Sequence, residues 1–231
     1  FTEKISACGA RLAIMPKRLR NAMLPEGIGA VYLDGTGHDC DVAGANSADP
    51  AAPVEIGCIE FSAGSRGPAK AVLITHSALA ARAATAAAIA GLVAEDRVAL
   101  QTSNASFEML LGCMLRGATA VFVPQQVLDS PAEYPRFIEK QKCSVVLMPT
   151  PLWRRVVWNA GEAFFDGVRL AIVYGARPSS ATISAFRKLV GRRVRGLASY
   201  GAAEAGANSA IYELPSGADG DGCGVKVVFQ S

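Results

Sequence analysis

The sequence predicts an α/β fold of mostly parallel sheets flanked by helices. Short runs rich in β-branched residues alternate with helix-length segments, as βαβ units require. Several short runs, such as AVFV, VVLM and LAIV, are continuously apolar, which is typical of strands covered on both faces. We expect strands at Arg11–Met15, Ala30–Asp34, Gly57–Ser62, Ala71–Thr75, Val98–Thr102, Ala120–Pro124, Ser144–Met148, Arg169–Tyr174 and Val194–Ala198.

Helices are expected between these strands, and several carry start signals. Thr75 or Ser77 can cap the second helix, and Ser179 or Ser180 can cap the last. Ser130 is followed by a proline and then an acid, the order that favours a helix start. The expected helices are Pro16–Met23, Ser77–Val93, Ser106–Arg116, Ser130–Lys142, Leu152–Asn159 and Ser179–Val190.

Two polar stretches rich in small residues divide the chain. Gly35–Val54 is predicted to be a loop or a seam between two sheet regions, and a second break follows Pro215 before the strand-like run VKVVF. Residues 1–54 are therefore expected to end a first sheet region and its linker. Residues 55–214 form the main α/β region, and residues 215–231 form a loop and the start of a further β region.

Composition excludes some partners. Of the 231 residues, 51% are hydrophobic, which is ample for a core, and the net charge of +3 predicts no nucleic-acid partner. The arginine-rich run Arg187–Arg195 lacks interleaved aromatic residues and is interpreted as a solvated helix face. No membrane span is predicted, because the most apolar run, Ala78–Val93, is short and interrupted by Arg82, as in a buried or half-buried helix.

The six cysteines predict a reduced protein rather than a metal or disulfide scaffold. No two have C-x-x-C spacing and there are only two histidines, so a structural zinc site is not expected. Cys113 and Cys143 lie in apolar segments and are predicted to be buried thiols. A cytoplasmic location fits this pattern. No signal peptide is visible, although the chain starts at Phe1 rather than Met.

The stretch Ile59–Thr75 (IEFSAGSRGPAKAVLIT) has the chemistry of a phosphate-binding loop. Small residues allow backbone N–H groups to converge on an anion, while hydroxyls and a lysine add donors and positive charge. The candidate ligands are Ser62, Gly64, Ser65, Gly67 and Lys70. It is not a Walker A loop, because the G-x-x-x-x-G-K-[ST] spacing is absent. The alternative is a Gly/Ser hairpin between two strands.

This stretch resembles the phosphate-loop signature Y-T-S-G-S-T-G-x-P-K-G-V of adenylate-forming enzymes. That superfamily contains acyl-CoA ligases, luciferases and the adenylation domains of nonribosomal peptide synthetases. Ser62 and Ala63 take the threonine and serine places of the signature. The residues that match it directly are Phe61, Gly64, Ser65, Gly67, Lys70 and Val72.

Four further stretches resemble the same superfamily in the same order. Asp96–Pro124 is similar to its strand, substrate-pocket turn and helix ending in G-A-T, and Pro149–Pro151 resembles its P-P-S turn. Arg169–Ser179 resembles the strand and turn that close over the adenine, and Ser199–Glu204 resembles N-x-Y-G-P-T-E. The resemblance implies that the chain is part of the large N-terminal domain of such an enzyme, most like a truncated peptide-synthetase adenylation domain.

The resemblance also implies a two-step activation. A carboxylate of a carboxylic or amino acid attacks the α-phosphate of Mg-ATP, and an acyl-adenylate and pyrophosphate are formed. The acyl group then passes to a thiol, either the phosphopantetheine of a carrier-protein domain or CoA. The protein's task would be to position the reactants and to neutralise charge on the phosphates.

Nucleotide contacts are implied for the residues that match the motifs. Ser62, Gly64, Ser65, Gly67 and Lys70 would hold the phosphates, with Lys70 in a catalytic role. Gly175 would approach the adenine, while Tyr200 and Gly201 would lie near the adenine or ribose. Glu204 would bind Mg²⁺ and serve catalysis. The alternative for Lys70 is an exposed strand-end lysine, and that for Gly175 is an ordinary turn glycine. For Tyr200 it is a half-buried core tyrosine, and for Glu204 a surface glutamate.

The acid pocket is implied to include Asn104, Glu108, Tyr174 and Ser199. Asn104 lies where amino-acid-activating members carry an aspartate that pairs with the substrate ammonium. A neutral amide would leave that cation unpaired, which favours an acid without an α-amine. Asn104 as a simple turn residue is the alternative. Glu108, one helical turn later, could line the same pocket or face solvent.

Departures from the family pattern leave two hypotheses open. Arg66 replaces a phosphate-loop threonine, Ala176 and Arg177 stand where glutamate is frequent, and Ala202 and Ala203 replace proline and threonine. The chain is thus either part of a working adenylation domain or a degenerate scaffold domain of a multidomain synthase. The family's ribose-binding aspartate and C-terminal catalytic lysine are expected beyond Ser231, so the isolated chain is expected to be inactive. A dinucleotide-binding fold is weakly supported, because the only G-x-G, Gly35–Gly37, lacks a third glycine and a helix.

Overall fold

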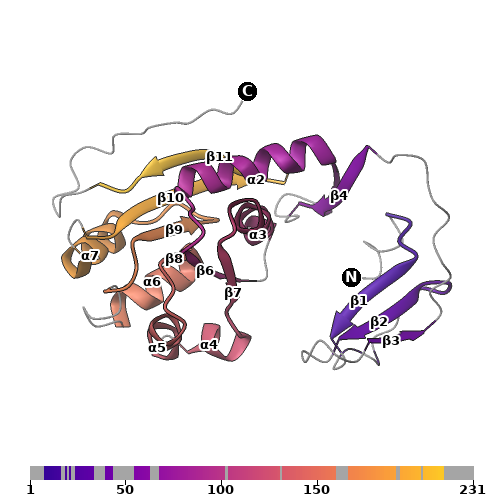
Figure 1. The fold of residues 1–231 in the computed structure, drawn as a ribbon, viewed down its shortest axis with the longest axis horizontal. Coiled ribbons are helices and arrows are strands. Elements are labelled where there is room, and N and C mark those ends of the chain that lie inside the picture. The colour runs from indigo at the N-terminus through magenta and orange to yellow at the C-terminus, as the bar shows by residue number, and fades with distance from the viewer. Residues whose placement is uncertain are drawn as a thin grey trace. The chain divides into compact units, whose positions relative to one another are not determined.

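The structure is a computed structural model, and it divides into two compact units, Phe1–His76 and Ser77–Ser231 (Figure 1). Each unit is described separately, with element labels as in Figure 1. The residues that the structure describes are 8–16, 19, 21, 24–33, 40–43, 55–62, 68–101, 104–130, 132–159, 166–190, 193–203 and 205–215.

The first unit contains a three-stranded sheet and a two-stranded ladder. Strands β1 (Leu12–Pro16) and β2 (Gly29–Leu33) pair in parallel, and β3 (Cys40–Ala43) joins β2 antiparallel. Strands β4 (Ile56–Phe61) and β5 (Ala71–Thr75) pair antiparallel. The small core of the three-stranded sheet consists of Ala13, Met15, Ala30 and Tyr32.

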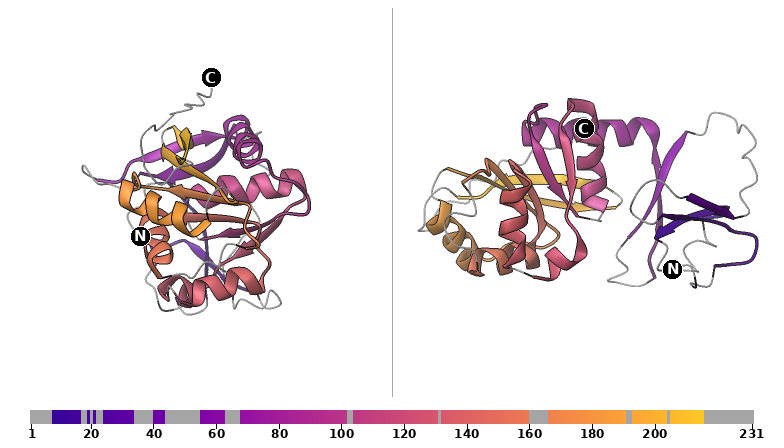
Figure 2. Two further views of the ribbon diagram at one scale, coloured as in Figure 1. Left: turned by 90° about the vertical axis from the view of Figure 1, so that its left-hand side faces the viewer. Right: turned by 60° about the horizontal axis from the view of Figure 1, so that its bottom comes forward.

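The second unit is built on a six-stranded sheet with the order β11-β10-β9-β8-β6-β7 (Figure 2). All neighbouring strands pair in parallel except β10 and β11. The strands are β6 (Arg97–Leu100), β7 (Thr119–Phe122), β8 (Val145–Pro149), β9 (Leu170–Tyr174), β10 (Arg195–Ala202) and β11 (Gly206–Glu213).

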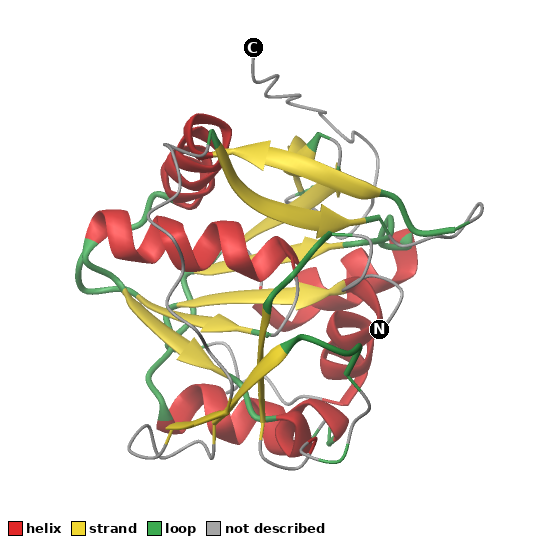
Figure 3. Ribbon diagram, turned by 90° about the vertical axis from the view of Figure 1, so that its right-hand side faces the viewer, coloured by secondary structure: helices red, strands yellow, loops and turns green. Residues whose placement is uncertain are grey.

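Helices cover both faces of this sheet (Figure 3), because alternate strand residues point to opposite sides. Val145 and Leu147 pack with α2 (His76–Ala90) and α3 (Asn104–Arg116). Val146 and Met148 pack with α5 (Glu133–Lys140), α6 (Thr150–Asn159) and α7 (Ser180–Val190). This two-sided burial confirms the predicted α/β fold of mostly parallel strands and flanking helices.

The alanine-rich helix α2 lies close to α3. A Cβ at Gly112 of α3 would lie 3.1 Å from the carbonyl oxygen of Ala83 and 3.4 Å from Cβ of Ala87. Glycine facing alanine therefore allows the two backbones to approach closely. None of the helices described in the structure is long and apolar enough to cross a membrane.

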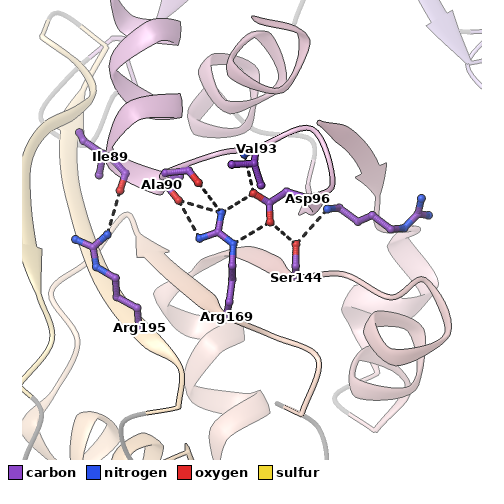
Figure 4. Close-up of polar contacts among 9 residues, drawn as sticks. Ile89, Ala90, Val93, Asp96, Ser144, Arg169 and Arg195 are labelled. Carbon is purple, nitrogen blue, oxygen red and sulfur yellow. Dashed lines mark hydrogen bonds and ion pairs between the residues drawn. The ribbon is translucent and has the colours of Figure 1, made fainter. Parts of the chain in front are cut away.

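The amino ends of the parallel strands are joined by an ion pair between buried Asp96 and the more exposed Arg169 (Figure 4). Asp96, which is 3% exposed, accepts hydrogen bonds from Arg169 Nε at 2.8 Å, Ser144 Oγ at 2.7 Å and the Val93 backbone at 3.0 Å. Arg169 also donates to the carbonyl oxygens of Ala90 and Gly91 at the end of α2. These residues precede β6, β8 and β9, so one network joins three strands and a helix.

The predicted elements are largely confirmed, and the differences are local. Strands β3 and β11 were not predicted; β3 lies inside the expected loop, and β11 is the antiparallel edge strand. The helix predicted at Ser130–Lys142 is confirmed as α5, but it begins three residues later, after Ala132, which makes no side-chain cap. The short helix α4 (Gln125–Asp129) that precedes it was not predicted. The helix predicted at Pro16–Met23 and the strand-like run VKVVF fall largely or wholly outside the described residues.

Two predictions about single side chains have opposite outcomes. Ser179 does cap α7, because its Oγ accepts a hydrogen bond from the Thr182 backbone at 3.2 Å. Arg187, predicted to lie on a solvated face, is buried and donates to the carbonyl oxygens of Val194, Leu214 and Pro215. Carbonyl groups that no strand pairs with need donors, and the guanidinium supplies them.

Cys113 and Cys143 are buried as predicted, each 1% exposed. Burial raises the pKa of each thiol to about 11, so both stay protonated at neutral pH.

Candidate functional site

Most of the predicted site residues of the second unit lie at the carboxyl ends of its parallel strands. In open α/β sheets ligands bind at this edge. Strand β6 leads to Gln101 and α3, β8 ends at Pro149, β9 ends at Tyr174, and β10 carries Ser199 and Tyr200. Tyr174 pairs in register with Pro149 on one side and Ser199 on the other. The segments predicted to bind the acid and the adenine are therefore neighbours.

Gln101 anchors the entry to the predicted acid pocket. Its side-chain amide donates to the Leu147 carbonyl at 3.3 Å, and its backbone N–H donates to Ser106 Oγ at 3.3 Å. Both Gln101 and Ser106 are buried. The start of α3, which carries Asn104, is thus attached to strands β6 and β8. The side chain of Asn104 lies outside what the structure describes.

Glu108 lies inside the molecule, not in solvent. It is 1% exposed, and its Oε1 lies 3.8 Å from Nη1 of Arg82 on α2. Burial of a carboxylate in this position requires a compensating charge. Sequence reasoning treated Arg82 only as an interruption of an apolar run, and the structure identifies it as the partner of Glu108.

The turn after β9 has an open backbone at Gly175. Gly175 has φ +93°, a conformation that residues with a side chain rarely adopt. A Cβ built there meets no described atom within 4 Å. Thr150 Oγ1 lies 3.1 Å from the carbonyl oxygen of Tyr174 and 2.5 Å from that of Ala176, so this hydroxyl holds the turn.

On the neighbouring strand β10, Ser199 and Tyr200 point to different surroundings. Ser199 is 7% exposed, whereas Tyr200 is 63% exposed and is therefore not a core tyrosine. The β10–β11 register shifts between Tyr200 and Ala202, which marks a bulge next to Gly201. Because Ser199 pairs with Tyr174, Tyr200 and Gly175 are the next residues on adjacent strands. Glu204 lies outside the described residues.

The predicted phosphate loop is part of the first unit, between β4 and β5. The Lys70 backbone N–H donates to Ser62 Oγ at 2.9 Å, and the Ser62 N–H donates to the Lys70 carbonyl at 3.0 Å. Ser62 and Lys70 therefore face each other at the base of a hairpin, with Lys70 exposed. Gly64, Ser65, Arg66 and Gly67 lie outside the described residues, so phosphate binding by this loop stays a prediction.

A hollow of about 430 Å³ adjoins the Gly175 turn and the start of α7. Sequence reasoning did not identify it. It is lined by Arg177, Pro178, Ser179, Ser180, Ile183, Tyr212 and Pro215. Over the part of the chain that the structure describes, no group of three or more His, Cys, Asp or Glu side chains could hold a metal ion.

Comparison with known proteins assigns the family. Residues 6–230 match the model of the family described as AMP-binding enzyme. The chain belongs to the AMP-binding enzyme family. This match includes all five motif stretches noted in the sequence, and it confirms the resemblance to adenylate-forming enzymes.

Two curated relatives of this AMP-binding chain are large synthases. It is 30% identical over 175 residues to the isonitrile lipopeptide synthase of Streptomyces coeruleorubidus, a match that covers 72% of this chain and 12% of the synthase. It is 27% identical over 130 residues to surfactin synthase subunit 2 of Bacillus subtilis (strain 168), covering 54% of this chain and 4% of that protein. The chain thus corresponds to a small part of each.

Solved structures share the fold of this AMP-binding chain. IdnL1 superimposes with a TM-score of 0.77 at 18% identity, over 98% of this chain and 46% of that one. The nonribosomal peptide synthetase FmoA3 in its AMPPNP-bound form gives 0.73 at 18% identity, over 94% and 24%. The Klebsiella oxytoca NpsA N-terminal subdomain in complex with 3-hydroxybenzoyl-AMSN gives 0.74 at 20% identity, over 96% and 55%.

Proposed function

We propose that this chain forms the nucleotide- and acid-binding part of an adenylation domain that activates a carboxylic or amino acid with ATP. The match of residues 6–230 to the AMP-binding enzyme family carries the proposal, because it includes every motif predicted to touch ATP or the acid. FmoA3 in its AMPPNP-bound form and NpsA in complex with 3-hydroxybenzoyl-AMSN have the same fold, which supports a nucleotide site in this chain.

In the proposed reaction, a carboxylate oxygen attacks the α-phosphorus of ATP, and the bond to the bridging oxygen of pyrophosphate breaks. The products are an acyl-adenylate and pyrophosphate. ATP supplies the activated phosphoryl group, and the protein supplies position and charge. We assign Ser62, Gly64, Ser65, Gly67 and Lys70 to the phosphates, with Lys70 neutralising charge that develops on the leaving group.

The nucleoside would lie against the ends of β9 and β10. We assign Gly175 to close backbone approach, and Tyr200 and Gly201 to the adenine or ribose. The exposed ring of Tyr200 and the open space at Gly175 support this assignment. Glu204 would bind Mg²⁺, which bridges phosphate oxygens in nucleotide sites of this kind.

The acid would lie near Asn104, Glu108, Tyr174 and Ser199. The amide of Asn104 favours an acid without an α-amine, because it offers no charge to a buried ammonium group. The buried carboxylate of Glu108 is already opposed by Arg82 at 3.8 Å, so it adds little net negative charge to the pocket. The acyl group would pass to the phosphopantetheine thiol of a carrier-protein domain, or to CoA, in the cytoplasm.

The second candidate function is a degenerate scaffold domain without catalysis. Arg66, Ala176 and Ala203 favour it, since each replaces a residue type that the family uses near the nucleotide. ATP–pyrophosphate exchange by the complete gene product, with a panel of aryl, alkyl and amino acids, separates the two functions. Exchange with at least one acid supports the enzyme, whereas no exchange together with no ATP binding by calorimetry supports the scaffold.

A matched measurement uses the 231-residue chain alone. We expect no adenylation turnover from it, because it spans only 12% of the isonitrile lipopeptide synthase and 46% of IdnL1. Acyl-adenylate formation by the isolated chain would contradict that expectation.

A further inference from the structure

The hydroxyl group of Thr150 contacts two carbonyl groups on either side of Gly175. Thr150 is the first residue of α6, directly after β8, and its Oγ1 lies 3.1 Å from the Tyr174 oxygen and 2.5 Å from the Ala176 oxygen. Its one proton is therefore shared between two acceptors on the neighbouring strand end. Neither distance follows from sequence spacing, since Thr150 and Ala176 are 26 residues apart.

Thr150 is itself held by a well-packed helix. Leu152, Trp153, Val156 and Val157 of α6 are all buried, and the Trp153 ring lies 5.3 Å from that of Phe186 on α7. Rotation or translation of α6 would disturb these contacts, which are dense in a packed core. The Thr150 hydroxyl is thus a fixed point at the carboxyl edge of the sheet.

The turn that it contacts is open on another side. Gly175 and Ala176 are exposed, and a Cβ at Gly175 would meet no described atom within 4 Å. A glycine with φ +93° has few steric restraints of its own. A bond that fixes the flanking peptides therefore decides how this turn presents its backbone.

The two carbonyl contacts set the direction of two N–H groups. In a trans peptide the C=O and the following N–H point in opposite directions. With the Tyr174 and Ala176 carbonyls directed to Thr150, the N–H groups of Gly175 and Arg177 point away from it. These are backbone donors, and an adenine ring has acceptor nitrogens that such donors can bind.

We propose that Thr150 is a positioning residue for the nucleotide, holding the Tyr174–Arg177 backbone in the orientation that receives the adenine base. The inference rests on the proposed function of the site, and it adds a residue that would not touch ATP. It predicts that loss of the hydroxyl weakens ATP binding without unfolding the protein and without a comparable effect on the acid.

The test compares T150V, T150S and T119V. Valine replaces the hydroxyl by a methyl group of similar size, and serine keeps the hydroxyl. T119V makes the same chemical change at an exposed position at the amino end of β7. Backbone ¹⁵N relaxation of the 231-residue chain reports the mobility of the Gly175–Arg177 amides, and calorimetry reports ATP affinity. The complete gene product gives the KM for ATP and for the acid.

For T150V we expect the backbone order parameters of the turn to fall from about 0.85 to below about 0.6, because the restraint on the turn is lost. We expect ATP binding weakened by about fivefold, because binding must then order the turn, at a cost of the size of one residue's backbone entropy, with a matching rise in the KM for ATP. T150S and T119V should behave as the parent. Unchanged order parameters and unchanged ATP affinity in T150V would overturn the inference, and so would an equal change in the KM of the acid.

The inference and the proposed function fail in different ways. If neither the parent 231-residue chain nor the complete gene product binds ATP, the proposed function is wrong, and so is the role of Thr150 in nucleotide binding. If the parent binds ATP and T150V binds it equally well, the proposed function stands and the role of Thr150 is wrong.

Discussion

In the six-stranded sheet, the amino ends and the carboxyl ends of the parallel strands (the amino edge and the carboxyl edge) differ in how their polar groups are used. At the amino ends of the strands, Asp96 is 3% exposed and joins Arg169, Ser144 and the backbone of Val93 in one network. At the carboxyl ends, Gly175 is open and Tyr200 is 63% exposed. At the amino edge the polar side chains bind one another, whereas at the carboxyl edge the Gly175 backbone and the Tyr200 ring are accessible to a ligand.

This difference indicates that residues at the amino edge stabilise the unit, while residues at the carboxyl edge are available for binding. Arg169 satisfies the carbonyl groups of Ala90 and Gly91, which end α2 and have no helical partner. The strands are thus joined at one end by charge-assisted bonds. The loops at the other end can then vary, as binding loops on a rigid scaffold do. Substitutions at the amino edge should therefore lower the free energy of unfolding, and substitutions at the carboxyl edge should lower the affinity for ATP.

The largest effect is expected from Asp96→Ala. It removes the buried acceptor of hydrogen bonds from Arg169, Ser144 and the Val93 backbone. Bonds to a charged group contribute about 1.5–3 kcal/mol each and do not add fully, so we expect a loss of about 3–5 kcal/mol. Urea denaturation of the 231-residue chain measures the loss in the free energy of unfolding. Glu133→Ala, which removes the exposed Arg136–Glu133 pair at 3.2 Å, is the control and should change it by less than about 0.5 kcal/mol. Similar effects of both variants would refute the special role of the amino edge.

The next effect is expected from Arg187→Met. The buried guanidinium donates to carbonyl oxygens of Val194, Leu214 and Pro215, and methionine leaves these acceptors unsatisfied. We expect a loss of about 2–4 kcal/mol in the free energy of unfolding. Arg193→Met removes an exposed pair with Asp166 at 2.9 Å and should cost far less. Equal costs would mean that Arg187 is solvated after all.

Lowering the pH should reduce the free energy of unfolding as Asp96 at the amino edge becomes protonated. Hydrogen bonds from Arg169 are the main cause that lowers the pKa of Asp96 from 3.8 to about 2. A depressed folded-state pKa contributes stability that is complete above the unfolded pKa and is lost as pH falls through the folded one. About 2 kcal/mol should therefore disappear between pH 3.8 and about 2. Asp96→Asn should lose this part of the pH dependence of the unfolding free energy; an unchanged profile would contradict the assignment.

The smallest effect on stability is expected from Tyr200→Ala. The side chain is 63% exposed, so the free energy of unfolding should change by less than about 0.5 kcal/mol. The same variant should weaken ATP binding by roughly tenfold, because aromatic stacking on a base contributes about 1–3 kcal/mol. Trp158→Ala, at an aromatic residue that is 60% exposed on α6, is the control for exposed aromatic loss. Unchanged ATP affinity in Tyr200→Ala would remove the stacking role.

Several elements could be predicted because their residues carry the reason locally. The runs VVLM and LAIV became β8 and β9, buried on both faces, and the Ser179 hydroxyl caps α7 as expected. Strand β11 was missed because its sequence, GANSAIYE, is polar and small at its start, and its pairing with β10 is a tertiary contact. Helix α4 was not predicted, and the start of α5 was placed three residues too early, because Ser130, expected to begin a helix, is the C-cap of α4.

In the candidate site, too, some residues could be predicted from local sequence and others could not. Gly175 could be identified from a motif, and its φ of +93° agrees with the need for glycine. The contacts of Arg82 and of Thr150, which was noted only as part of a family turn, could not be predicted, because their partners Glu108 and Ala176 are 26 residues away in each case and meet only after folding. The roles of Lys70 and Glu204 in binding stay predictions.

By itself the sequence determined the α/β class, the family resemblance and the stretches that approach the nucleotide, because hydrophobic periodicity and short motifs are local properties. Only the tertiary structure decided which charges are buried and what holds the turns. The sequence does not show what Asp96, Arg187 and Thr150 contact. Their importance comes from carbonyl groups and charges that other strands bring to them, and burial makes leaving such groups unpaired costly.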